Sequence, residues 1–139
     1  MVTNISLTMA AALLAVAASS AAPSKAQTAC PVTERPIDKA QQIDWQGQRI
    51  YFCCASCPAK FKADPEKYFA KLASQGVELE NIQTTCPVSG ERLGEMGEPT
   101  RIVFQGRTVK FCCPACEKEF RKDPAKYLAA MPGEQGGGK

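Results

Sequence analysis

Apolar and polar residues alternate in two stretches of the chain, and each stretch has a glycine at its centre. The apolar positions are Ile43, Trp45, Ile50 and Phe52 around Gly47 in the first stretch, and Ile102, Phe104, Val109 and Phe111 around Gly106 in the second. Alternation on both sides of a glycine is typical of a β-hairpin with one buried face, because the glycine supplies the positive φ of a tight turn. The pattern therefore predicts two β-hairpins.

Helical periodicity follows each hairpin. Asp64-Pro65 and Asp123-Pro124 have the residue types expected at an N-cap and at the first position of a helix. Apolar residues recur behind them at helical spacing, namely Tyr68, Phe69 and Leu72 in the first case and Tyr127, Leu128 and Met131 in the second. A shorter helix is expected before each Asp-Pro pair, since Cys57 and Phe61 lie four residues apart and so share a helix face.

These two blocks are copies of one module. An offset of 59 residues superimposes Phe52 on Phe111 and Asp64 on Asp123, whereas Cys30 matches Cys86 at an offset of 56, so the second copy has three extra residues. The predicted organisation is a first module over residues 30–73, a polar linker over residues 74–84 and a second module over residues 86–131. Residues 132–139 are Gly-rich and are expected to be disordered.

The N-terminus resembles a leader for export. Residues 7–18 are apolar and Ala-rich, small residues follow them, and the run is too short to span a bilayer. Residues 1–6 carry no Lys or Arg, which is unusual for a signal peptide. We predict a signal peptide over residues 1–22 and a soluble mature protein, periplasmic or secreted, that does not insert into the membrane after cleavage.

Charge and composition exclude several functions. The net charge is only +3, and the basic residues are interspersed with acidic ones. They therefore form no clustered basic face that could bind nucleic acid. The chain has no histidine to act as a base, no serine nucleophile elbow and no phosphate-cradling glycine loop. We therefore predict a protein without catalytic activity.

Eight cysteines fall into two sets of four. The sets are Cys30, Cys53, Cys54 and Cys57, and Cys86, Cys112, Cys113 and Cys116. A module of about 45 residues needs a disulfide, a metal or a partner to be stable. Disulfides suit an exported protein. However, three thiols within five positions, joined by one from an upstream loop, favour tetrahedral thiolate coordination over a framework linking distant segments. All eight cysteines are candidate metal ligands.

The spacing and its surroundings resemble the TRASH and YHS-type metal-binding domains. The shared features are the loop cysteine, the Gly-containing hairpin, Phe-Cys at the strand end, and a following Phe and Pro-x-x-Tyr. The resemblance covers nearly all of both modules. It implies a small α+β fold of two tandem zinc-knuckle or treble-clef-like modules, each a β-hairpin followed by two short helices. It also implies that Cys30, Cys53, Cys57, Cys86, Cys112 and Cys116 are ligands.

The chain departs from this family at three places in each module. Cys30 and Cys86 stand three positions earlier than the family's loop cysteine, and Thr33 and Ser89 occupy that cysteine's usual position. Cys54 and Cys113 stand where the family usually has serine. These two thiols either complete a four-thiolate shell or remain free, and the sequence does not distinguish the two.

Because every candidate ligand is a thiolate, the site should select a thiophilic ion, Zn²⁺ or Cu⁺, at about one ion per module. The family resemblance implies metal buffering, trafficking or resistance. Two alternatives belong to other classes. The Cys-x-x-Cys pairs, Cys54 with Cys57 and Cys113 with Cys116, could carry out thiol–disulfide exchange. The modules could also be zinc-stapled units that bind a protein partner.

Overall fold

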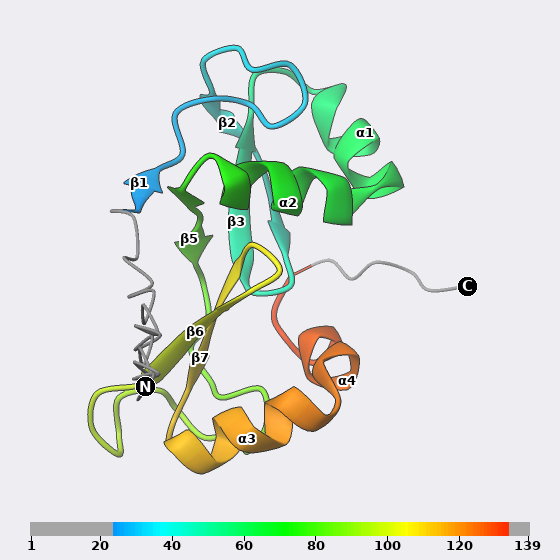
Figure 1. Ribbon diagram of the computed structural model, residues 1–139. Coiled ribbons are helices and arrows are strands. Elements are labelled where there is room, and N and C mark those ends of the chain that lie inside the picture. Colours follow the sequence, from blue (N-terminus) through cyan, green and yellow to red (C-terminus); the bar gives the residue numbers. More distant parts are fainter. Residues whose placement is uncertain (1–23, 134–139) are drawn as a thin grey trace, which may run out of the picture.

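The protein is a small α+β protein with two cysteine-rich modules, one above the other in Figure 1. A computed structural model describes residues 24–133, so the predicted signal peptide (1–22) and most of the predicted tail (134–139) lie outside the described residues. The first module contains β2 (Asp38–Trp45), β3 (Gln48–Phe52), α1 (Cys57–Ala63) and α2 (Pro65–Ser74). The second contains β6 (Thr100–Phe104), β7 (Arg107–Phe111), α3 (Pro114–Lys122) and α4 (Pro124–Ala129).

Each alternating stretch forms an antiparallel pair closed by a two-residue turn. Trp45 pairs with Gln48 across the first turn, and Phe104 pairs with Arg107 across the second. Both residues of each turn have positive φ, 44° and 76° at Gln46 and Gly47 and 48° and 77° at Gln105 and Gly106. This is the backbone of a type I′ turn, whose twist matches that of the strands.

One phenylalanine organises the core of each module. The Phe61 ring lies 5.4–5.7 Å, between centroids, from four other aromatic rings, those of Trp45, Phe52, Tyr68 and Phe69. Phe120 has the same place in the second module, against Phe104, Phe111 and Tyr127. Both phenylalanines are fully buried. Helix and hairpin are thereby fixed to each other next to the thiols.

Asp64 caps α2 as its position before Pro65 predicts. Its carboxylate accepts a hydrogen bond from the Lys67 amide at 3.3 Å. We expect Asp64→Ala to lower the free energy of unfolding by about 1 kcal/mol, because one amide of the first turn loses its acceptor. Chemical denaturation of the metal-loaded protein measures this. Asp64→Asn, which keeps a capping oxygen, is the control, and an equal loss in both variants would contradict a capping role.

The segment predicted as a polar linker adds strands to the first module. β4 (Val77–Glu78) pairs in parallel with β1 (Lys25–Ala26), and β5 (Glu80–Asn81) pairs with β3. Leu79, between them, is only 4% exposed. Two-residue strands are too short to give a readable alternation, so the polar composition of the segment concealed them.

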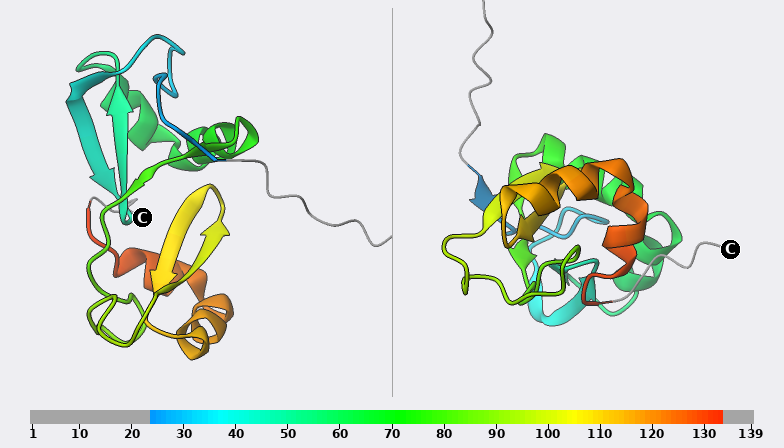
Figure 2. Two further views of the ribbon diagram at one scale, coloured as in Figure 1. Left: turned by 90° about the vertical axis from the view of Figure 1, so that its left-hand side faces the viewer. Right: turned by 90° about the horizontal axis from the view of Figure 1, so that it is seen from below.

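The two modules dock through the tips of their hairpins, which lie side by side and point in opposite directions (Figures 1 and 2). Gln48 of the first hairpin is fully buried; its side-chain amide donates to the Thr108 carbonyl at 2.8 Å and accepts from the Thr108 amide at 3.3 Å. Gln83 makes the same pair of bonds with Lys110. These amide side chains thus hydrogen-bond the backbone N–H and C=O groups on the outer edge of β7, as a neighbouring strand would.

Arg107 occupies the matching position of the second hairpin, 59 residues after Gln48. Its guanidinium is fully buried, lies over the Phe69 ring at 3.8 Å and forms a two-pronged ion pair with Glu66 of α2. The first hairpin in turn meets the end of the second module, since the Gly47 amide donates to the Pro132 carbonyl at 2.7 Å. Pro132, the first residue of the predicted tail, is therefore held against the first module.

Within residues 24–133, no helix combines the length and the apolar character that crossing a membrane requires.

Candidate metal centres

The structure brings three cysteines of each module together. The Sγ atoms of Cys30, Cys53 and Cys57 all lie within 4.8 Å of one another, and so do those of Cys86, Cys112 and Cys116. In each cluster one thiol comes from a loop before the hairpin, one from the end of the second strand and one from the first helix. These are the six positions that the family resemblance marked as ligands.

The spacing of the sulfurs fits a thiolate-bound ion. The Cys53 and Cys57 Sγ atoms are 3.7 Å apart, and those of Cys112 and Cys116 are 3.6 Å apart. Two thiolates on a tetrahedral zinc ion, with bonds of about 2.3 Å, lie about 3.8 Å from each other. The strand-end and helix thiols of each cluster therefore need little movement to bind such an ion.

A tight turn presents the loop thiol of each module. After Cys30, the Glu34 amide donates to the Cys30 carbonyl at 2.8 Å, and Glu34 has a positive φ of 62°. Gly90 occupies the matching position after Cys86, with a φ of 76° and the same bond at 2.9 Å. The turn directs its amides at the sulfur, which favours the thiolate form that a metal ligand must adopt.

The pKa values of the loop thiols, Cys30 and Cys86, are lowered. Burial raises the pKa of Cys30, but hydrogen bonds from the amide and hydroxyl of Thr33 and from the Cys53 amide outweigh it and lower the pKa to about 7. Burial acts in the same way on Cys86, where the amides of Ser89 and Cys112 outweigh it and lower the pKa to about 7. Near neutral pH, much of each loop cysteine is therefore thiolate, which is the form that binds a cation.

The helix thiols show the opposite effect. Burial raises the pKa of Cys57 to about 12, and the adjoining thiols of Cys54 and Cys53 contribute to the rise. Burial and the neighbouring Cys112 thiol also raise the pKa of Cys116. Three sulfurs this close resist carrying three negative charges together, and a bound cation would remove that resistance.

Two hydroxyls support the strand-end thiols. The Thr33 Oγ1 lies 3.0 Å from the Cys53 Sγ, and the Ser89 Oγ lies 3.3 Å from the Cys112 Sγ. The sequence singled out Thr33 and Ser89 only as positions that lack the family's cysteine. Their recurrence at matching positions was the available signal that they adjoin the site.

Cys54 and Cys113 lie beside the clusters, one in each module. The Cys54 thiol is exposed, with its Sγ 3.3 Å from that of Cys57 and 3.8 Å from that of Cys53. The Cys113 Sγ lies 3.7 Å from that of Cys116. Hydrogen bonds from the Ser56 hydroxyl and the Cys57 thiol lower the pKa of Cys54 to about 6. Each cluster therefore has a fourth thiol beside it.

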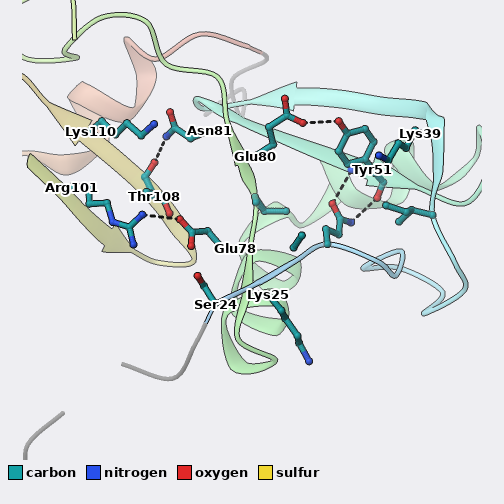
Figure 3. Close-up of a pocket in the computed structure, with 14 residues that line it drawn as sticks. Ser24, Lys25, Lys39, Tyr51, Glu78, Glu80, Asn81, Arg101, Thr108 and Lys110 are labelled. Carbon is teal, nitrogen blue, oxygen red and sulfur yellow. Dashed lines mark hydrogen bonds and ion pairs between the residues drawn. The ribbon is translucent and has the colours of Figure 1, made fainter. Parts of the chain in front are cut away.

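A separate cavity of about 470 Å³ lies where the two modules meet (Figure 3). Two side-chain pairs line it: the Tyr51 hydroxyl donates to Glu80 at 2.6 Å, and the Arg101 guanidinium donates to Glu78 at 3.3 Å. No cysteine is among the described residues that line it. The thiol chemistry is thus confined to the two clusters.

The comparisons with known proteins support a role in metal binding. A 49-residue segment, 35% of the chain, is 39% identical to a silver exporting P-type ATPase of Salmonella typhimurium. That match spans 6% of the length of the ATPase. No family model and no solved structure matches the chain. Together with the two clusters, the partial match fits a cysteine-rich metal-binding protein.

Proposed function

We propose that the protein binds two thiophilic metal ions, one through Cys30, Cys53 and Cys57 and one through Cys86, Cys112 and Cys116. The observation that carries this proposal is the convergence of three Sγ atoms within 4.8 Å in both modules. The low pKa of each loop thiol and the hydroxyl beside each strand-end thiol support the thiolate forms of these clusters. Binding, rather than catalysis, is the proposed activity.

We also propose that each module is a zinc-knuckle or treble-clef-like unit of the TRASH/YHS type. A turn that supplies one thiol, a hairpin that supplies the second and a helix that supplies the third are the parts of such a unit. The hydroxyls at Thr33 and Ser89 leave three thiolates where a closed structural site has four. A three-thiolate site keeps a position open for exchange.

The proposed ions are Zn²⁺, Cu⁺ and Ag⁺. Thiolate-only sites select soft ions over Mg²⁺, Ca²⁺ and Mn²⁺. The partial match to a silver exporting ATPase is the reason to include Ag⁺. The proposed role is buffering, trafficking or resistance in an exported protein, for which the resemblance of residues 7–18 to a signal peptide is the support.

Native mass spectrometry with elemental analysis tests the proposal. The protein is purified anaerobically and offered Zn²⁺, Cu⁺ or Ag⁺ in the presence of a competing chelator. We expect two ions per chain, both lost when the thiols are alkylated. A protein that binds none of these ions, or keeps them after alkylation, would refute metal binding through the cysteines.

Thiol–disulfide exchange is the second candidate. It is favoured by the 3.3 Å between the Cys54 and Cys57 Sγ atoms and by the low pKa of the exposed Cys54. A thiolate near neutral pH is the attacking species in such exchange. Replacing Cys54 and Cys113 by Ser should abolish reaction with oxidised glutathione if this candidate is correct, while the three-thiolate sites still bind metal.

A further inference from the structure

The two metal sites differ where the sequence of the two modules differs. Between the adjacent cysteines and the helix cysteine, the first module has Ala55-Ser56 and the second has Pro114-Ala115. This is a difference within a five-residue segment that is otherwise the same. Its effect on the backbone decides how far each site is open to solvent.

The first helix of the second module begins at Pro114, two positions earlier in the repeat than Cys57, where α1 begins. A residue before proline is driven into an extended conformation, and Cys113 has φ −157° and ψ 163° and caps α3, which begins at Pro114. In the first module α1 begins only at Cys57, and Ser56 caps it with φ −83° and ψ −18°. Residues 54–56 lie before the assigned helix, although the same bond, from the amide of the helix cysteine to the carbonyl three residues earlier, is 3.2 Å long in both modules.

The exposure of the thiols follows from this. Cys54 is exposed and Cys53 is half-buried, whereas Cys113 is half-buried and Cys112 is only 8% exposed. The Cys54 Sγ also lies closer to its helix thiol, 3.3 Å against 3.7 Å for Cys113, and 3.3 Å from the Ser56 Oγ. The first cluster thus has an accessible fourth sulfur that contacts two of its thiols, whereas the fourth sulfur of the second cluster is half-buried.

We propose that the first module is the site of metal transfer and that the second retains its ion. This rests on the proposed binding of one ion per module. An incoming thiolate must reach the ion before a resident sulfur leaves, and the first cluster, whose fourth thiol is exposed, offers more access than the second, whose fourth thiol is half-buried. Cys54 is the positioning and transfer residue: it holds the departing ion while a cluster sulfur is released.

The exchange changes ligands and leaves the oxidation state of the ion unchanged. The acceptor is a thiol-bearing peptide or protein. Its thiol loses a proton to solvent and forms a metal–sulfur bond. One metal–sulfur bond to the first cluster then breaks, and the released thiolate takes up a proton. Repetition of this step moves the ion to the acceptor.

Exchange kinetics on the full chain test the inference. The protein is loaded with two Zn²⁺ ions and mixed with excess reduced glutathione and a chromogenic zinc chelator. We expect two phases of equal amplitude, the faster at least about tenfold faster than the slower. Alkylation with N-ethylmaleimide after the fast phase should label Cys30, Cys53, Cys54 and Cys57 and leave Cys86, Cys112 and Cys116 unlabelled.

Loop exchange between the modules supplies the matched variants. Ala55→Pro with Ser56→Ala gives the first module the loop of the second and should slow the fast phase about tenfold. Pro114→Ala with Ala115→Ser should accelerate the slow phase. Cys54→Ser should slow the fast phase and still bind two ions, whereas Cys113→Ser should leave the fast phase unchanged.

The outcomes separate the two proposals. A protein that cannot be loaded with two Zn²⁺ ions refutes the proposed function and this inference with it. Two bound ions that leave at one rate, or a fast phase that labels Cys86, Cys112 and Cys116, overturn only the inference. A loss of one ion in Cys54→Ser would also overturn it, because Cys54 would then be a permanent ligand.

Discussion

Cys57→Ser is expected to halve the metal content of the protein, from two ions per chain to one. Cys57 is 1% exposed, and its Sγ is one of the three that lie within 4.8 Å of one another, so the substitution removes a buried ligand from the first site. A serine hydroxyl is a hard, uncharged donor and a poor ligand for a soft ion. We expect the affinity of the first site to fall by more than the ~10–100-fold that is typical of changes outside the ligand shell.

The loss of the ion should also destabilise the first module. Binding of a structural zinc contributes roughly 10–16 kcal/mol to the folding of a small domain, and a module of this size has little core to replace it. Limited proteolysis of the variant should therefore cut within residues 30–73 and spare residues 86–131. The docked second module is the internal reference.

Cys54→Ser is the matched control, because it makes the same chemical change in the same cluster at an exposed thiol. It should keep two ions and resist proteolysis. Native mass spectrometry measures the number of ions bound to each variant. Two ions retained by Cys57→Ser, or one lost by Cys54→Ser, would show that the ligand set is not Cys30, Cys53 and Cys57.

The clusters were predictable because their signal is local and occurs twice. The offset of 59 residues pairs each strand-end cysteine, helix cysteine and Asp-Pro cap with its copy, so the repeated spacing marks all eight cysteines as candidates, and the family resemblance selects six of them. Sequence alone did not separate Cys54 from Cys53, since adjacent residues are ambiguous in their direction. The exposure of Cys54 follows from where α1 begins, at Cys57, which depends on how the loop packs.

The docking of the modules was not predictable, because its partners are distant in sequence and polar. Gln48 and Thr108 are 60 residues apart, and a lone glutamine in a strand gives no sign that its amide will satisfy another strand's edge. Arg107 is charged, so composition places it on the surface. It is buried because Glu66 and the Phe69 ring are both supplied by the other module.

Gly106→Ala tests whether this docking stabilises the protein. A Cβ at Gly106 would lie 2.5 Å from the Phe69 carbonyl oxygen, which belongs to the backbone of α2 and cannot move aside as a side chain can. Steric overlap of this kind costs about 1–3 kcal/mol, and the φ of 77° adds about 1–2 kcal/mol for any L-residue. We therefore expect the free energy of unfolding to fall by about 2–5 kcal/mol.

Two other turn glycines separate the steric cost from the backbone cost. Gly76 has a φ of 68°, but a Cβ there would meet nothing within 4 Å, so Gly76→Ala should cost only the backbone strain of about 1–2 kcal/mol. At Gly47 the Cβ would meet the end of the Met131 side chain, which is flexible, so Gly47→Ala should fall between the two. Denaturation of the metal-loaded variants gives the three values. Equal losses at Gly106 and Gly76 would mean that the hairpin tip does not press on α2 in solution. A larger loss at Gly106, with two ions still bound, would mean that docking stabilises modules that each form their own metal site.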